Sequence, residues 1–173
     1  GRLNTENFRL GAFMGTDELG NISLSGAVKG SGFTLKDLNA NFNGSIKQIE
    51  FNDYNFRNIE LNGKFEKKQF NGHLTIDDPN LKINSLDGML SLAGKKEIAF
   101  NLNADLAYAH LKNIRFTKDD FTLSGLFALN FTGNNIDNFL GTAKLYNASL
   151  THDSTRLSLD SLTLSSFIRD EKK

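Results

Sequence analysis

The chain contains no cysteine and no tryptophan, and its only proline is Pro79. The absence of cysteine excludes a disulfide framework and thiolate metal sites. Neither sign of charge is in excess, because 20 Lys and Arg residues balance 20 Asp and Glu residues. Proteins that bind nucleic acid or anionic membranes through charge usually carry a basic excess. Nucleic acid is therefore not an expected partner.

Long hydrophobic runs are absent too. No apolar stretch approaches the ~20 residues that a membrane-spanning helix needs, and the opening GRLNTENF does not read as a signal peptide. Both ends of the sequence are abrupt, so we expect a fragment of a longer protein. All-β folds commonly reach 173 residues without splitting. We therefore expect a single domain over residues 1–173.

Alternation of apolar and polar residues is the dominant feature that is present. The clearest run places Ile98, Phe100, Leu102, Ala104 and Leu106 on one face of a strand. One apolar and one polar face is typical of antiparallel sheets. We expect an all-β chain of roughly ten to thirteen strands, with short helical candidates only at residues 105–111 and 134–140. The single proline, in DDPN, predicts a turn, and Lys64, Lys67 and Lys68 surround a second expected hairpin turn.

Glycines interrupt the apolar face of several expected strands, at Gly26, Gly63, Gly72, Gly88 and Gly125. Glycine inside a strand marks a bend or the close approach of another backbone or a ligand. A strongly curved sheet and a closed β-sandwich with bulges both accommodate this pattern. Two stretches also resemble each other, which predicts a pseudo-repeat over residues 22–65 and 121–167.

Residues that could carry chemistry are scattered. His73, His110 and His152 are isolated in sequence, and the Asp77–Asp78 and Asp119–Asp120 pairs lack the further oxygen ligands of a calcium loop. No nucleophile elbow, phosphate loop or dinucleotide fingerprint occurs. We therefore expect no catalytic site, no metal site and no cofactor.

Four stretches, LSGAVKGSGFTLKDLNANFNGSI, FNGHLTIDDPNL, LNADLAYAHLKNI and NFTGNNIDNFLGTAKLYNASL, resemble the periplasmic shaft of the AsmA-like superfamily, most closely its TamB family of translocation and assembly module proteins. The resemblance implies an internal segment of a periplasmic protein that is anchored in the inner membrane. It further implies a sheet folded lengthwise into a taco-like trough, phospholipid transport between membranes, a part in outer-membrane assembly, and an Omp85-type β-barrel partner.

Candidate lining residues are the large side chains of the apolar face, which we expect to shelter phospholipid acyl chains in a hydrophobic groove. They are Leu24, Val28, Phe42, Phe65, Leu74, Phe100, Leu102, Phe121, Leu123, Phe127, Leu129 and Phe131. The alternative is an ordinary packed core, in which case the chain is a ligand-free structural or interaction module of the cell envelope. Apolar sheet edges also make self-association an expected property.

Overall fold

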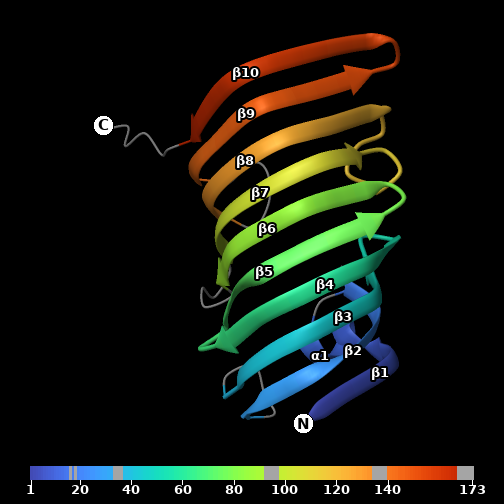
Figure 1. Cartoon of the computed structure of the whole chain (residues 1–173), viewed down its shortest axis with the longest axis vertical. Coiled ribbons are helices and arrows are strands. Elements are labelled where there is room, and N and C mark those ends of the chain that lie inside the picture. The colour runs from blue at the N-terminus through green and yellow to red at the C-terminus, as the bar shows by residue number, and fades with distance from the viewer. Residues whose placement is uncertain (16, 18, 33–36, 92–97, 134–139, 167–173) are drawn as a thin grey trace, which may run out of the picture.

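The computed structural model describes residues 1–15, 17, 19–32, 37–91, 98–133 and 140–166. Ten strands follow one another in chain order in a single antiparallel sheet (Figure 1). The elements are β1 (Arg2–Arg9), α1 (Leu10–Met14), β2 (Leu19–Ser31), β3 (Asn39–Phe51), β4 (Tyr54–Glu66), β5 (Gln69–Asp78), β6 (Leu81–Ser91), β7 (Ile98–His110), β8 (Phe121–Gly133), β9 (Leu140–His152) and β10 (Thr155–Ser166). The prediction of an all-β chain is confirmed.

The sheet is open. Strands β1 and β10 are its two edges and, within the described residues, they do not pair with each other. Each strand bends along its length, so that the sheet forms a curved trough (Figure 1). The predicted curved antiparallel sheet is therefore confirmed, and a two-sheet sandwich is not what the chain adopts.

Bulges bend the strands at a common level. Six of the nine strand pairings contain a register shift, in most cases next to the line of paired residues Ile46, Ile59, Ile76, Ile83 and Leu106. A bulge inserts an extra residue, kinks its strand and increases the local twist. Asn7, Asn58 and Asn147 have positive φ values of 52°, 53° and 47° inside β1, β4 and β9. Asparagine tolerates this left-handed conformation better than most residues do, so part of the abundant asparagine shapes strands and not only turns.

Tight turns join the long strands. Asn52–Asp53 and Lys67–Lys68 both have two successive residues at positive φ, the pattern of the hairpin turn whose twist matches that of the flanking strands. The predicted turn at the three lysines is thereby confirmed. Strand β5 ends at Asp78, directly before Pro79, as the DDPN motif predicts.

The helical prediction at residues 105–111 is wrong, because residues up to His110 belong to β7. The physical reason is the bulge between Leu106 and Ala109, which pair with Gly125 and Leu123 of β8. It places two residues three apart on the same face, and this spacing imitates a helix. The other helical prediction, 134–140, lies outside the described residues except for Leu140, which begins β9. The helix that is present, α1, is a single short turn.

The buried core occupies only part of the apolar face. Its members are Ile22, Ile46, Phe56, Ile59, Ala109 and Ile114. Ile114 belongs to the β7–β8 connection, and Leu10 of α1 packs against the same cluster. The connection and the helix therefore cover the part of the apolar face to which β2, β3, β4 and β7 contribute these buried residues. We call this covered region the closed end.

Candidate functional site

The twelve predicted lining residues lie on one face of the sheet. The strand register places six apolar residues in one line, one from each of the strands β3 to β8. Phe131 pairs with Phe100, which pairs with Leu90, and the line continues through Phe70 and Phe65 to Ala40. We call this line the phenylalanine row. The rings of Phe100 and Phe131 meet edge to face, with centroids 5.8 Å apart.

A second line runs beside it, two residues further along each strand. Large side chains stand at its two ends, where Val28 pairs with Phe42 and Leu102 pairs with Leu129. Gly63, Gly72 and Gly88 form the middle of the line. We call this line the glycine row. The remaining lining residues lie further along the strands on the same face. They are Leu74, Phe127, Leu24, Leu123 and Phe121.

Aromatic rings fill the space that the glycines leave. A Cβ placed on Gly72 would lie 2.7 Å from Cζ of Phe70, and the same ring also lies against Gly63. The ring of Phe42 covers Gly26 and Gly44 in the same way. A Cβ placed on these glycines would lie 2.8 and 3.0 Å, respectively, from Cζ of Phe42. The rings therefore lie flat along the face instead of standing away from it. The glycines allow this close packing within one sheet, and no ligand is needed to explain them.

Exposure separates the lining residues from a normal core. All twelve are half-buried, and none is either fully buried or fully exposed. Leu24 and Leu74 pack against the closed end. Among the described residues, the other ten lie outside that cluster. The apolar face thus has a protein-covered part and a part on which large apolar side chains retain solvent contact.

A buried carboxylate holds the closed end together. Asp78 is 1% exposed, and its carboxylate accepts hydrogen bonds from the Tyr54 phenol (2.6 Å), the Arg57 amide (3.0 Å) and the Asn80 amide (2.8 Å). Burial, and then the hydrogen bond to Asp78, raise the pKa of Tyr54. The network fixes the β5–β6 turn against β4.

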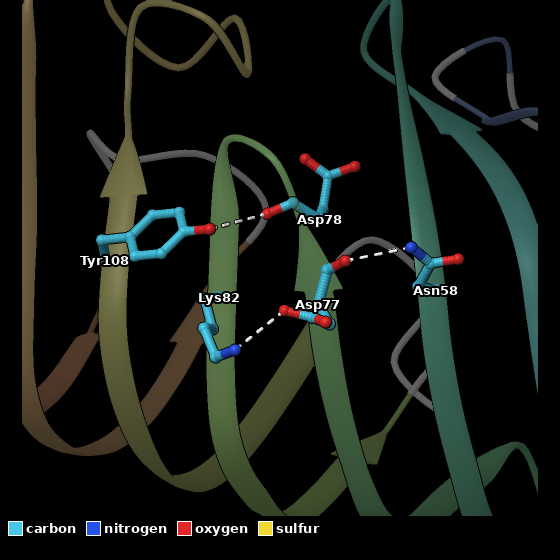
Figure 2. A network of polar contacts seen from close by, with 5 residues as sticks. All are labelled: Asn58, Asp77, Asp78, Lys82 and Tyr108. Carbon is cyan, nitrogen blue, oxygen red and sulfur yellow. Dashed lines mark hydrogen bonds and ion pairs between the residues drawn. The ribbon is translucent and has the colours of Figure 1, made fainter.

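Further contacts tie this turn to its neighbours on both sides. Figure 2 shows Tyr108 of β7 donating to the Asp78 carbonyl at 3.2 Å and Asn58 of β4 donating to the Asp77 carbonyl at 3.1 Å. Lys82 of β6 forms an ion pair with Asp77 at 2.9 Å, and this contact raises the pKa of Lys82. Four successive strands are joined in this way.

Two isolated ion pairs lie on the polar face of the sheet, opposite the apolar one. His73 lies 2.8 Å from Asp87 and Lys64 lies 2.6 Å from Glu66, with all four side chains substantially exposed. The contact with Lys64 lowers the pKa of Glu66. Within the described part of the chain, no group of three or more His, Cys, Asp or Glu side chains is arranged to hold a metal ion. These contacts are ion pairs on a strand surface.

Sequence reasoning missed three features of the closed end. They are the helix α1, the packing of Ile114 against the core, and the burial of Asp78. The DDPN motif predicts a turn at Asp78 and does not predict its burial. The one signal that could have identified it is its position directly before the single proline, where the chain reverses and a carboxylate can accept nearby amides.

Comparison with protein-family models, with curated proteins and with solved structures finds no match to this chain. No helix in the described residues is long and apolar enough to cross a membrane.

Proposed function

We propose that the chain is a segment of a lipid-transport trough whose apolar face shelters the acyl chains of phospholipids. One observation carries the proposal: ten large apolar side chains from five strands lie outside the buried cluster and retain solvent contact on one face. Water-exposed apolar surface of this extent commonly marks a binding surface. An apolar ligand that covered it would complete the missing half of a core.

The dimensions suit an acyl chain. Adjacent strands lie about 4.8 Å apart, so the hydrocarbon depth of one leaflet, roughly 15 Å, corresponds to about three strand spacings. The phenylalanine row crosses six strands, from Ala40 to Phe131, and therefore offers enough length. Each methylene removed from water contributes about 0.8 kcal/mol, and binding of this kind requires no charged pocket. The neutral charge balance is compatible with it.

The cellular setting is part of the same proposal. The resemblance to the AsmA-like superfamily, in the four sequence stretches given above, supports a periplasmic location in a longer, inner-membrane-anchored protein. It also supports phospholipid transport, outer-membrane assembly and an Omp85-type β-barrel as partner. The sequence-based expectation that the chain has no catalytic site agrees with this role. The open, curved, antiparallel sheet and its apolar face give the structural support for the proposal.

Native mass spectrometry of the purified chain, with lipid extraction from the same sample, tests the proposal. We expect phospholipid to co-purify in near-stoichiometric amount and added fluorescent phospholipid to bind. A lipid-free mass, together with failure to take up added lipid, would instead assign the chain to the alternative class of ligand-free structural modules.

A further inference from the structure

The connection between β7 and β8 carries a group of cations at one end of the strands (Figure 1). One open pocket of this connection is lined by Lys112, Arg115, Phe116, Thr117 and Lys118. We call it the cationic pocket. Its three basic side chains are exposed, and within the described residues none of them forms an ion pair. Cations without carboxylate partners create a positive potential that favours an anion.

The nearest acidic residues along the connection do not line this pocket. Asp119 and Asp120 follow Lys118 in the sequence, and Asp53 belongs to the neighbouring β3–β4 turn, but all three are absent from the lining. The side chains that do line it are basic, aromatic or neutral. The pocket itself therefore suits an anion.

The backbone of the cationic pocket is held in place from several sides. Ile114 is 3% exposed and packs into the closed end. Asn113 donates a hydrogen bond to the Asn80 side chain at 2.8 Å, and Asn52 of the β3–β4 turn donates one to the Arg115 carbonyl at 3.1 Å. A site on a fixed backbone loses less conformational freedom when it binds a ligand.

The pocket also adjoins the apolar face. The ring centroids of Phe116 and Phe51 lie 6.5 Å apart, and Phe51 packs against the buried cluster of that face. Phe116 is nevertheless 59% exposed. Exposed apolar surface therefore continues from the face to the three cations.

Arg115 occupies a backbone position where glycine is the usual residue. Its φ is 69°, and its amide bonds to the Lys112 carbonyl at 3.1 Å while the Phe116 amide bonds to the Leu111 carbonyl at 2.9 Å. This hydrogen-bond pattern commonly ends a helical turn with a left-handed glycine, because a side chain there is unfavourable. An arginine at this position costs folding stability, which favours a role for its side chain outside folding.

We infer that the cationic pocket binds the phosphate of an anionic phospholipid whose acyl chains lie on the apolar face. The inference rests on the proposed function and adds the class of lipid. A guanidinium can donate two parallel hydrogen bonds to one phosphate, and the two ammonium groups can add charge-assisted bonds. A zwitterionic headgroup would bring its own cation close to these three. Free phosphate offers the same chemistry to the pocket but leaves Phe116 and the apolar face uncovered.

Headgroup preference tests the inference. Phosphatidylglycerol and phosphatidylcholine with the same fluorescent acyl chain are titrated into the wild-type chain and into a triple variant with Lys112→Gln, Arg115→Gln and Lys118→Gln. We expect the wild type to bind phosphatidylglycerol at least about tenfold more tightly than phosphatidylcholine. The triple variant should lose this preference and keep its affinity for phosphatidylcholine.

The matched control removes three other lysines, by Lys64→Gln, Lys67→Gln and Lys68→Gln around the β4–β5 turn. It lowers the net charge equally and should keep the preference. Equal loss in both triple variants, or no preference in the wild type, overturns the inference and leaves the lipid trough standing. Failure of the wild type to bind either lipid overturns both proposals.

Inorganic phosphate without lipid, followed by phosphorus NMR, separates the two sources of phosphate. We expect no saturable binding, because the free anion gains no burial of acyl chain. Saturable binding that the first triple variant abolishes would make the pocket a site for soluble phosphate and would contradict the inference.

Arg115→Gly distinguishes binding from folding. We expect its urea midpoint to equal or exceed that of the wild type, since glycine tolerates the left-handed backbone, and we expect its preference for phosphatidylglycerol to fall. A lower midpoint, or an unchanged preference, would show that Arg115 serves the fold and would overturn its assignment to the phosphate.

Discussion

The Tyr54 phenol donates a hydrogen bond of 2.6 Å to Oδ1 of Asp78 and at the same time accepts one of 2.9 Å from the side-chain Nδ2 of Asn80. Tyr54 begins β4, and Asp78 ends β5. Asn113 of the β7–β8 connection extends the network by donating to the Asn80 side chain at 2.8 Å. One hydrogen-bonded unit therefore connects β4, the β5–β6 turn and the β7–β8 connection that covers the closed end.

Replacement of Asp78 is predicted to destabilise the fold. Asp78→Ala leaves three donors in a buried site without an acceptor, and we expect a loss of about 3 kcal/mol in the free energy of unfolding. Urea denaturation followed by circular dichroism measures it. Asp77→Asn is the matched control, because that side chain is 72% exposed and its ion pair with Lys82 is screened by solvent. Equal losses in the two variants would show that burial of Asp78 has no energetic role.

The stability that Tyr54 contributes to the fold is predicted to decrease at alkaline pH. Its pKa in the folded chain is raised above the ordinary value of 10.0, first by burial and then by Asp78. A raised tyrosine pKa favours the neutral phenol, so this stabilisation is complete below about pH 10 and is lost as the pH rises through the folded-state value. We expect the difference in urea midpoint between wild type and Tyr54→Phe to be constant near neutrality and to shrink above pH 10.

The control for the pH series is Tyr146→Phe, which alters an exposed tyrosine on β9. It corrects for alkaline effects that are common to the whole chain. A Tyr54→Phe difference that stays constant up to pH 11, or that grows above pH 10, would contradict the assigned role of the phenol.

Strand alternation predicted most of this fold, because each strand needs one apolar face whatever covers it. The failures have local causes. The bulge at Leu106 and Ala109 gives these residues the spacing of a helix, so the sequence pattern predicts a helix in part of β7. Burial of Asp78 depends on register, which brings the Tyr54 and Arg57 groups of a neighbouring strand to it. Neither the pairing partner nor the covered end of a sheet is encoded in the alternation of a single strand.

Substitution of Gly72 is predicted to reveal the packing of aromatic rings on glycine. A Cβ on this residue would lie 2.7 Å from Cζ of Phe70 and 2.5 Å from the Asn62 carbonyl oxygen, so Gly72→Val should cost about 2 kcal/mol through overpacking. Phe70→Leu removes the ring. We expect the double variant to lose about 1 kcal/mol less than the sum of the single losses. Additive losses from urea denaturation would mean that the ring does not occupy the space above Gly72.

A charge on the apolar face is predicted to abolish lipid binding without unfolding the sheet. Phe127 is half-buried, pairs with Ala104 and Leu145 in the middle of the face, and lies outside the closed end. A carboxylate at this position would have to be desolvated by any acyl chain that covers it. Phe127→Asp should therefore reduce the binding of fluorescent phospholipid by more than about tenfold, while the β-sheet circular dichroism stays unchanged.

The neighbouring residue supplies the control for this variant. Leu126 is adjacent in sequence but lies on the opposite face, where it pairs with Tyr146, so Leu126→Asp should leave lipid binding intact. If Phe127→Asp removes the circular dichroism signal together with the lipid, Phe127 belongs to a closed core. If both variants retain lipid, the ligand binds elsewhere and the apolar face is not its site.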